Sequence, residues 1–280
     1  MSTLIRKPSP SPAEDDAVEA VRVHGEKKPH RVLTLTLQIG VFVGLCAVWQ
    51  ILADTETIDP FFFSRPSEIA SQVWRWMISG YIWPHLAVTL AEAMLAFVIG
   101  TVAGVAAGLA FARIELLAAV FDPYIRIFNA LPRVILAPIF ILWFGLGMAS
   151  KVALGVTLVF FVVFFNTFQG IREVDPVALN NARMLQATDR QLLRHVYLPS
   201  AMAWIFSSLH TSIGFALVGA VVGEYIGSAR GIGYVVAQAQ GVFDTAGVFA
   251  GLILTSAVVL VIDLAIHRLE RYLLRWRPRA

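Results

Sequence analysis

Between Arg172 and Pro199 the chain reads REVDPVALNNARMLQATDRQLLRHVYLP, a polar stretch that interrupts an otherwise apolar sequence. This stretch is too polar to cross a membrane, yet it carries two helix-start patterns. The first is Asp175 before Pro176, because an aspartate accepts from the free N–H groups of a helix start and proline tolerates the first helical position. We therefore expect a short helix from Pro176 to about Leu185.

The second helix start in this stretch is the run from Thr188 to Gln191. A threonine at the N-cap and a glutamine three residues later fit a capping box, in which each side chain accepts from the other residue's backbone N–H. The second short helix should end near Tyr197, and Pro199 should open the next long helix. The prediction is helix, tight turn at Gln186 and Ala187, helix, lying at a membrane surface. Local pattern alone fits equally well an interfacial hairpin that only connects two spans.

Apolar runs surround this segment on both sides. Of the 280 residues, 58% are hydrophobic and 15% charged, against about 25% charged in a soluble domain, and the mean hydropathy is +0.71. A spanning helix needs about 20 predominantly apolar residues. The sequence predicts an all-α membrane protein with six transmembrane helices, five of them at about 32–53, 87–112, 151–170, 199–223 and 248–267. The third lies in the apolar stretch 116–147, whose first half is interrupted by prolines and charged residues, and we expect an interfacial lead-in followed by a proline-bent span that ends near Trp143.

The basic residues predict the orientation of these spans. Most Lys and Arg residues lie in the N-terminal segment, in the loops after the second and fourth spans, and in the C-terminal tail. Cytoplasmic loops carry such an excess, so six spans place both termini in the cytoplasm. We expect a disordered cytoplasmic segment 1–31, a transmembrane domain 32–268 that contains the cytoplasmic loop 171–199, and a basic cytoplasmic tail 269–280. Beside a span, such a tail favours anionic lipid over nucleic acid as its partner.

Several kinds of chemistry have no motif in this sequence. It lacks G-x-x-x-x-G-K-[ST], H-E-x-x-H and G-x-S-x-G, and it has one cysteine, Cys46. We therefore predict no catalytic residue, no metal site and no cofactor in the chain. Gly100, Gly104 and Gly108, spaced by four in the second span, predict a face on which another helix packs closely.

Polar side chains inside spans are candidates for a translocation pathway. His210 lies roughly 16 Å along the fifth span, where it fits either an anion contact or a hydrogen bond to another helix. The guanidinium of Arg133 suits a sulfonate, nitrate or carboxylate, or else it extends to the headgroups. Glu92, Glu224 and Asp263 are expected to be interfacial or paired. The candidate pathway residues are Asn129, Arg133, Asn166, Ser208 and His210.

The stretch that opened this section resembles the EAA loop of ABC-importer permeases, whose pattern is E-A-A, three residues, G, nine residues, I-x-L-P. The spacing is retained in full. Three positions depart from the pattern, since Asn180 replaces the glutamate, Asn181 an alanine and Gln186 the glycine. Ala182 keeps the third position of the motif, and Val196, Leu198 and Pro199 fall on I-x-L-P.

Four further segments are similar to the nitrate, sulfonate and taurine branch of these permeases: 58–66, 139–147, 223–234 and the arginine-rich tail 268–277. The resemblance covers about residues 32–278 and implies a permease subunit in the bacterial inner membrane that carries a small anion of the nitrate, taurine or alkyl sulfonate type. An ion-coupled secondary transporter is the alternative, which predicts inverted repeats and several ionisable residues near the midplane. An intramembrane enzyme would need a convergent catalytic set within the spans.

The resemblance also implies the partners of the chain. A cytoplasmic ATPase dimer, which binds ATP and Mg²⁺, would dock on the loop 171–199. A second permease copy, identical or paralogous, would complete the pathway, and a periplasmic binding protein would deliver the solute. The residues expected to couple to the ATPase are Asn180, Asn181, Ala182, Leu185, Gln186, Ala187, Thr188 and Asp189.

Overall fold

The computed structural model describes the backbone of residues 31–273 and the side chains of residues 33–268. The segment expected to be disordered, 1–31, lies outside the described residues except for the backbone of Arg31, and so do the side chains of the tail 269–280. Contacts divide the chain into a unit Met1–Leu52 and a unit Ala53–Ala280. The first unit holds most of α2 (Arg31–Asp54), a helix long and apolar enough to cross a membrane.

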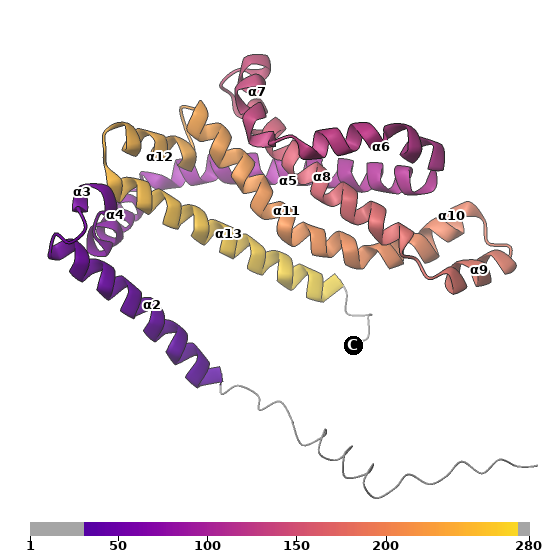
Figure 1. Cartoon of the computed structure of the whole chain (residues 1–280), viewed down its shortest axis with the longest axis horizontal. Helices are drawn as coiled ribbons and strands as arrows, with labels where there is room; N and C mark the ends of the chain where they lie inside the picture. Colours follow the sequence, from indigo (N-terminus) through magenta and orange to yellow (C-terminus); the bar gives the residue numbers. More distant parts are fainter. Residues whose placement is uncertain (1–30, 274–280) are drawn as a thin grey trace, which may run out of the picture. The chain divides into compact units, whose positions relative to one another are not determined.

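In the second unit, all regular secondary structure among the described residues is helical (Figure 1). The polar region after α2 forms two short helices, α3 (Pro60–Phe63) and α4 (Pro66–Ile78). Three long helices follow in chain order, α5 (Ile82–Arg113), α8 (Met148–Arg172) and α11 (Leu198–Ile226). Near the C-terminus lie α12 (Ile232–Gly241) and α13 (Thr245–Leu273).

The third predicted span is a broken helix. It consists of α6 (Glu115–Ala130), a 3₁₀ turn Arg133–Leu136 and α7 (Ala137–Phe144), and its two halves are bent by 86°. The bend follows from Pro132, which disfavours a helical conformation at the residue before it, and Leu131 is extended, with ψ 132°. Five helices are long and apolar enough to span a membrane, and the described residues reach six only if this bent pair counts as one.

The core of the second unit is the packing of α8 between α5 and α11 (Figure 1). The glycine face predicted on α5 is confirmed. A Cβ atom added at Gly100, Gly104 or Gly108 would lie 2.7–2.8 Å from a Cβ atom of Val159, Val163 or Thr167 on α8. On the other side of α8, a Cβ atom at Gly219 of α11 would lie 2.4 Å from the Cα of Gly155. Small residues therefore set both helix separations.

The segment between α8 and α11 forms the predicted first helix, α9 (Pro176–Met184), followed by α10 (Asp189–Leu192). Pro199 lies in the first turn of α11, as predicted, but no break separates α11 from the helix before it. A π-helical turn, Leu193–Tyr197, joins α10 to α11, so helix continues from Asp189 to Ile226. In this turn Leu198 N–H donates to the Leu193 carbonyl, five residues back. The wider turn accommodates Pro199, which lacks an N–H and whose ring crowds the preceding turn.

Candidate functional site

The α9–α10 hairpin is held by local hydrogen bonds at each of its turns. The Asp175 side chain accepts from Val177 N–H at 2.8 Å, which caps the start of α9 as predicted. At the end of α9, Gln186 has a left-handed φ of +57°. Its N–H donates to the Arg183 carbonyl at 2.9 Å, and the next N–H, that of Ala187, reaches the Ala182 carbonyl at 3.1 Å. This pair of bonds is a Schellman motif.

The predicted capping box at the start of α10 is confirmed. Thr188 N–H donates to the Gln191 side chain at 2.8 Å, and Gln191 N–H donates to the Thr188 hydroxyl at 3.4 Å. Asp189 lies 3.7 Å from the Arg113 guanidinium at the end of α5. Leu192, the last residue of α10, is buried. The hairpin is thus a rigid element that continues directly into α11 and lies beside the end of α5.

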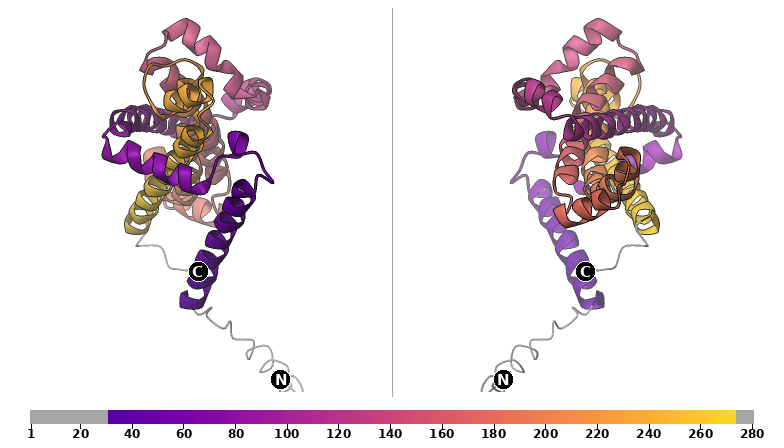
Figure 2. Two further views of the ribbon diagram at one scale, coloured as in Figure 1. Left: turned by 90° about the vertical axis from the view of Figure 1, so that its left-hand side faces the viewer. Right: turned by 90° about the vertical axis from the view of Figure 1, so that its right-hand side faces the viewer.

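The outward face of the hairpin is apolar at its tip. Val177, Met184 and Leu185 are exposed, the last by 84%. The eight residues predicted to couple to an ATPase all lie on this one hairpin. Ala182 and Ala187 are half-buried, and the other six are exposed. Figure 2 shows α9 and α10 facing the viewer in its right-hand view.

The five candidate pathway residues lie on four elements, which are α6, the 3₁₀ turn after it, α8 and α11. Arg133 donates to the Asn129 carbonyl at 3.3 Å and also to its side-chain oxygen, and its guanidinium lies 4.4 Å from the Phe161 ring centroid. Asn166 donates to the Val162 carbonyl of its own helix, and Ser208 is buried and donates to the Ile205 carbonyl. His210 Nδ1 lies 3.1 Å from Asp263 Oδ1 on α13. The structure therefore brings together Asn129 and Arg133, while His210 connects two helices.

A buried polar cluster, centred on Glu224, lies at the end of α11 remote from the hairpin. Glu224 is 1% exposed and accepts from the Thr89 hydroxyl and from Gly233 N–H, both at 2.7 Å. The Thr89 hydroxyl in turn accepts from Ile232 N–H at 2.8 Å. A Cβ atom at Gly231, whose φ is +106°, would lie 2.1 Å from the Glu224 carboxyl carbon. The glycines of the segment 223–234 therefore let this carboxylate approach the backbone that begins α12.

Two further charged residues belong to the Glu224 cluster. Glu92 is 2% exposed and Lys151 is fully buried, and both interact electrostatically with Glu224. The Lys151 ammonium also donates to the Leu146 carbonyl. Of the two alternatives predicted for Glu92 and Glu224, interfacial or paired, the structure supports the paired one. Sequence reasoning missed the cluster as a unit, although three ionisable residues within apolar helices were a signal for it.

The comparisons with known proteins agree with this arrangement of helices. Residues 100–275 match the family described as "Binding-protein-dependent transport system inner membrane component". The permease protein SsuC of Bacillus subtilis, named for aliphatic sulfonates transport, is 32% identical, covering 92% of this chain and 93% of the relative. The riboflavin transport system permease protein RibX of Chloroflexus aurantiacus is also 32% identical, covering 83% and 87%. The taurine transport system permease protein TauC of Escherichia coli is 28% identical, covering 86% and 90%.

Solved structures show the same fold. A chain of the inward-facing MetNI methionine ABC transporter has a TM-score of 0.57 and 20% identity, covering 70% of this chain and 96% of its own length. A chain of an amino acid ABC transporter has a TM-score of 0.54 and 23% identity, covering 69% and 92%. With the family match over most of the helical unit, these findings show that the chain belongs to the binding-protein-dependent inner membrane components, as a multi-pass inner-membrane permease of an ABC importer rather than an enzyme.

Proposed function

We propose that this permease forms the pathway for a small sulfonate-type anion and is driven by a separate ATPase dimer that docks on the α9–α10 hairpin. In this proposal a periplasmic binding protein delivers the solute, a second permease copy completes the pathway, and ATP and Mg²⁺ are bound by the ATPase. Relatives named for aliphatic sulfonates and taurine support the sulfonate class. Relatives named for riboflavin and formylaminopyrimidine are about as identical to this chain as the relatives named for sulfonates. Overall similarity therefore does not distinguish the cargo, which depends on local residues.

The observation that carries the proposal is the hairpin's combination of rigidity and exposed apolar surface. A docking lever must not bend, and this one is closed by a Schellman motif, a capping box and a continuous helix into α11. A docking surface also needs apolar side chains that are exposed to solvent in the free chain and become buried when the partner binds. Met184 and Leu185, exposed by 81% and 84%, provide them next to the turn. Motion of an attached ATPase would pass through α10 to the whole of α11.

The remaining parts of the chain are assigned on the same proposal. Residues 32–268 form the permease domain and 171–199 its coupling loop. The termini, 1–31 and 269–280, lie in the cytoplasm on the side of the hairpin. The positive-inside rule supports this orientation, because Arg113, Arg172 and the arginines of the hairpin lie at one end of α5, α8 and α11.

Copurification with the ATPase tests the docking surface. Leu185→Asp places a charge in the middle of the proposed contact and should abolish copurification, while the fold persists because the side chain is exposed. Ile78→Asp is the matched control, since Ile78 is an exposed apolar residue of α4, outside the hairpin. Ala187→Arg, at the half-buried side of the turn, should uncouple uptake from ATP hydrolysis with the spans still folded. Uptake by the isolated chain driven by a proton or sodium gradient would refute the proposal in favour of a secondary transporter.

A further inference from the structure

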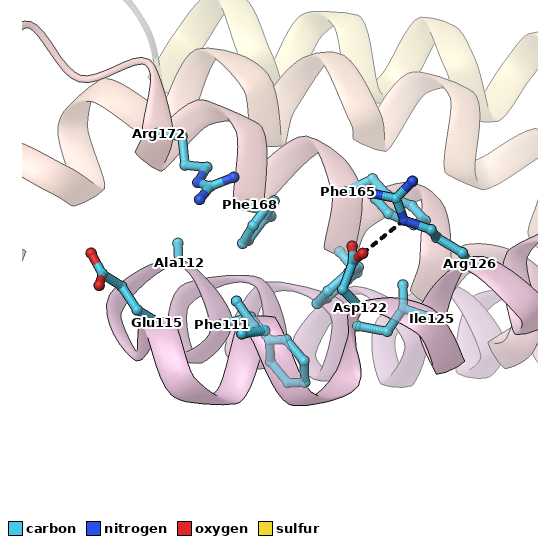
Figure 3. Close-up of a pocket in the computed structure, with 12 residues that line it drawn as sticks. Phe111, Ala112, Glu115, Asp122, Ile125, Arg126, Phe165, Phe168 and Arg172 are labelled. Atoms are coloured by element: carbon cyan, nitrogen blue, oxygen red, sulfur yellow. Dashed lines mark hydrogen bonds and ion pairs between the residues drawn. The ribbon is translucent and has the colours of Figure 1, made fainter.

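A cavity of about 460 Å³ lies between α5, α6 and α8 (Figure 3). It is lined by the C-terminal end of α5, by most of α6 and by the last turns of α8. Arg172, which lines it, is the last residue of α8, and α9 begins four residues later. The cavity is therefore close to the coupling hairpin, at the proposed cytoplasmic mouth of the pathway. None of the candidate pathway residues lines it.

One wall of this cavity is made of phenylalanine rings that hold one another in place. Phe111 of α5 meets Phe164 of α8 edge to face, with ring centroids 5.4 Å apart. Phe164 and Phe168 are stacked, with centroids 6.1 Å apart. Such mutual contacts fix the ring orientations before a ligand arrives. The wall thus offers a preformed apolar surface for a methylene chain.

Four charged residues line the same cavity, and they differ in whether they are neutralised. Arg126 and Asp122 form an ion pair at 2.8 Å within α6, drawn as a dashed line in Figure 3. Arg172 lies 4.9 Å from the Phe168 ring centroid, and among the residues that the structure describes its side chain has no ion-pair partner. Within the same range, Glu115 at the start of α6 has neither a side-chain hydrogen bond nor an ion pair. One cation on α8 and one anion on α6 are left for a ligand.

A simple anion fits this pair of charges poorly. It would be attracted by Arg172 and repelled by Glu115, so the two terms oppose each other. A molecule with both signs of charge satisfies the two side chains at once. Guanidinium groups bind tetrahedral oxyanions through parallel N–H bonds, and a carboxylate accepts from an ammonium group. The two charges and the phenylalanine wall together match a zwitterion whose charged groups are joined by a short methylene chain.

We propose that this cavity binds a zwitterion whose ammonium group meets Glu115, whose tetrahedral oxyanion meets Arg172, and whose methylene spacer lies against the phenylalanine wall. This chemistry can come from two sources, a free aminoalkanesulfonate such as taurine or the headgroup of phosphatidylethanolamine in the membrane. With taurine as ligand, the site rests on the proposed function and narrows the cargo from sulfonates in general to aminosulfonates.

Binding to the full-length chain in nanodiscs of phosphatidylglycerol tests the site without ATPase or binding protein. Radiolabelled taurine should bind at least tenfold more tightly than ethanesulfonate, which lacks only the ammonium group. Arg172→Gln and Glu115→Gln should each weaken taurine binding at least tenfold. Arg75→Gln and Glu173→Gln remove the same charges from exposed positions outside the cavity and should leave the affinity unchanged.

A charge exchange separates recognition from general damage. The double variant Arg172→Glu with Glu115→Arg keeps one charge of each sign in the cavity, and a zwitterion can bind it in the reverse orientation. Taurine binding should return to within about threefold of the wild type in the double variant and stay weak in either single variant. Failure of the exchange to restore binding, while the single variants fold and bind weakly, would overturn the proposed pairing.

Native mass spectrometry assigns the source of the zwitterion. If the ligand is the lipid, the wild type taken from membranes rich in phosphatidylethanolamine should retain that lipid, and Arg172→Gln and Glu115→Gln should lose it, with no taurine binding. Measurable and equal binding of taurine and ethanesulfonate overturns the site, and so does a wild type that binds neither taurine nor phosphatidylethanolamine. ATP-driven uptake without such binding would overturn the zwitterion site and leave the proposed function intact. Binding without ATPase association would support the site and overturn the proposed function.

Discussion

Glu224 of α11 accepts a hydrogen bond from the Thr89 hydroxyl of α5 at 2.7 Å, and both side chains are buried. The two residues are 135 positions apart in the chain. Through Gly233 N–H and Ile232 N–H the same pair holds the start of α12. The end of the bundle opposite the α9–α10 hairpin is therefore held by polar contacts, while the middle of the bundle is packed by glycine faces.

Thr89→Val tests these polar contacts. The substitution leaves Ile232 N–H without its acceptor and Glu224 without one of its donors, which should cost about 1–3 kcal/mol. Thr101→Val is the matched control on the same helix, because the Thr101 hydroxyl is buried without a hydrogen-bond partner among the described residues. Thermal unfolding of the purified protein should show a lower apparent Tm for Thr89→Val and an unchanged or higher one for Thr101→Val. Equal Tm values for the two variants would contradict the assigned role.

Gly104→Ala tests the close approach of α5 and α8. Its Cβ atom would lie 2.8 Å from Val163 Cβ and 2.9 Å from the Phe160 carbonyl oxygen, so the helices must separate at a cost of about 1–3 kcal/mol. Gly44→Ala in α2 has nothing within 4 Å of its new Cβ atom and gains helix propensity of about 1 kcal/mol. The apparent Tm should fall for the first variant and hold or rise for the second. A tolerated alanine at 104 would mean that α5 and α8 separate at little cost.

Gln186→Gly tests the turn of the hairpin. A left-handed conformation costs a residue with a side chain about 1 kcal/mol that glycine does not lose, and Gln186 has φ +57°. Glycine should slow hydrogen exchange of the amides that close the Schellman motif by about fivefold. Gln186→Val, which is β-branched, should accelerate it. Exchange rates that do not distinguish the two variants would show that the turn opens independently of this residue.

Asp189→Asn tests how far the ion pair to Arg113 stabilises the hairpin. The two charged groups are 3.7 Å apart, and the Asp189 side chain is 88% exposed. Exposed pairs of this kind contribute about 0–1 kcal/mol. A double-mutant cycle with Arg113→Gln should therefore give a coupling energy below about 0.5 kcal/mol that disappears in high salt. A coupling of several kcal/mol would mean that the pair is shielded from solvent in the assembled transporter.

Local sequence predicted those parts of the candidate site whose hydrogen bonds are also local. Asp175 and Thr188 cap helices that begin one residue later, so their roles follow from the identities of a few neighbours. The start of α11 near Pro199 was predicted correctly, but the continuity of helix from α10 into α11 was not predicted. Helix continues through Pro199 because a π-helical turn precedes it, and the residue pattern does not predict such a turn.

Contacts between residues far apart in the chain decided the buried cluster around Glu224 and the cavity beside α6. The apolar runs and the capping residues by themselves determined that this protein is an all-α membrane protein with a capped hairpin between two spans, because span length and capping depend on adjacent residues. The permease role was implied by the resemblance of that hairpin to the EAA loop. Only the tertiary structure placed Glu224 against Thr89 and the helix start at Gly231. Only it brought Arg172 and Glu115 to one cavity with no ion-pair partner among the described residues. The physical reason is that a buried charge or an open cavity is defined by which distant helices pack around it. That packing is set by the glycine faces of α5, α8 and α11 together rather than by any one segment.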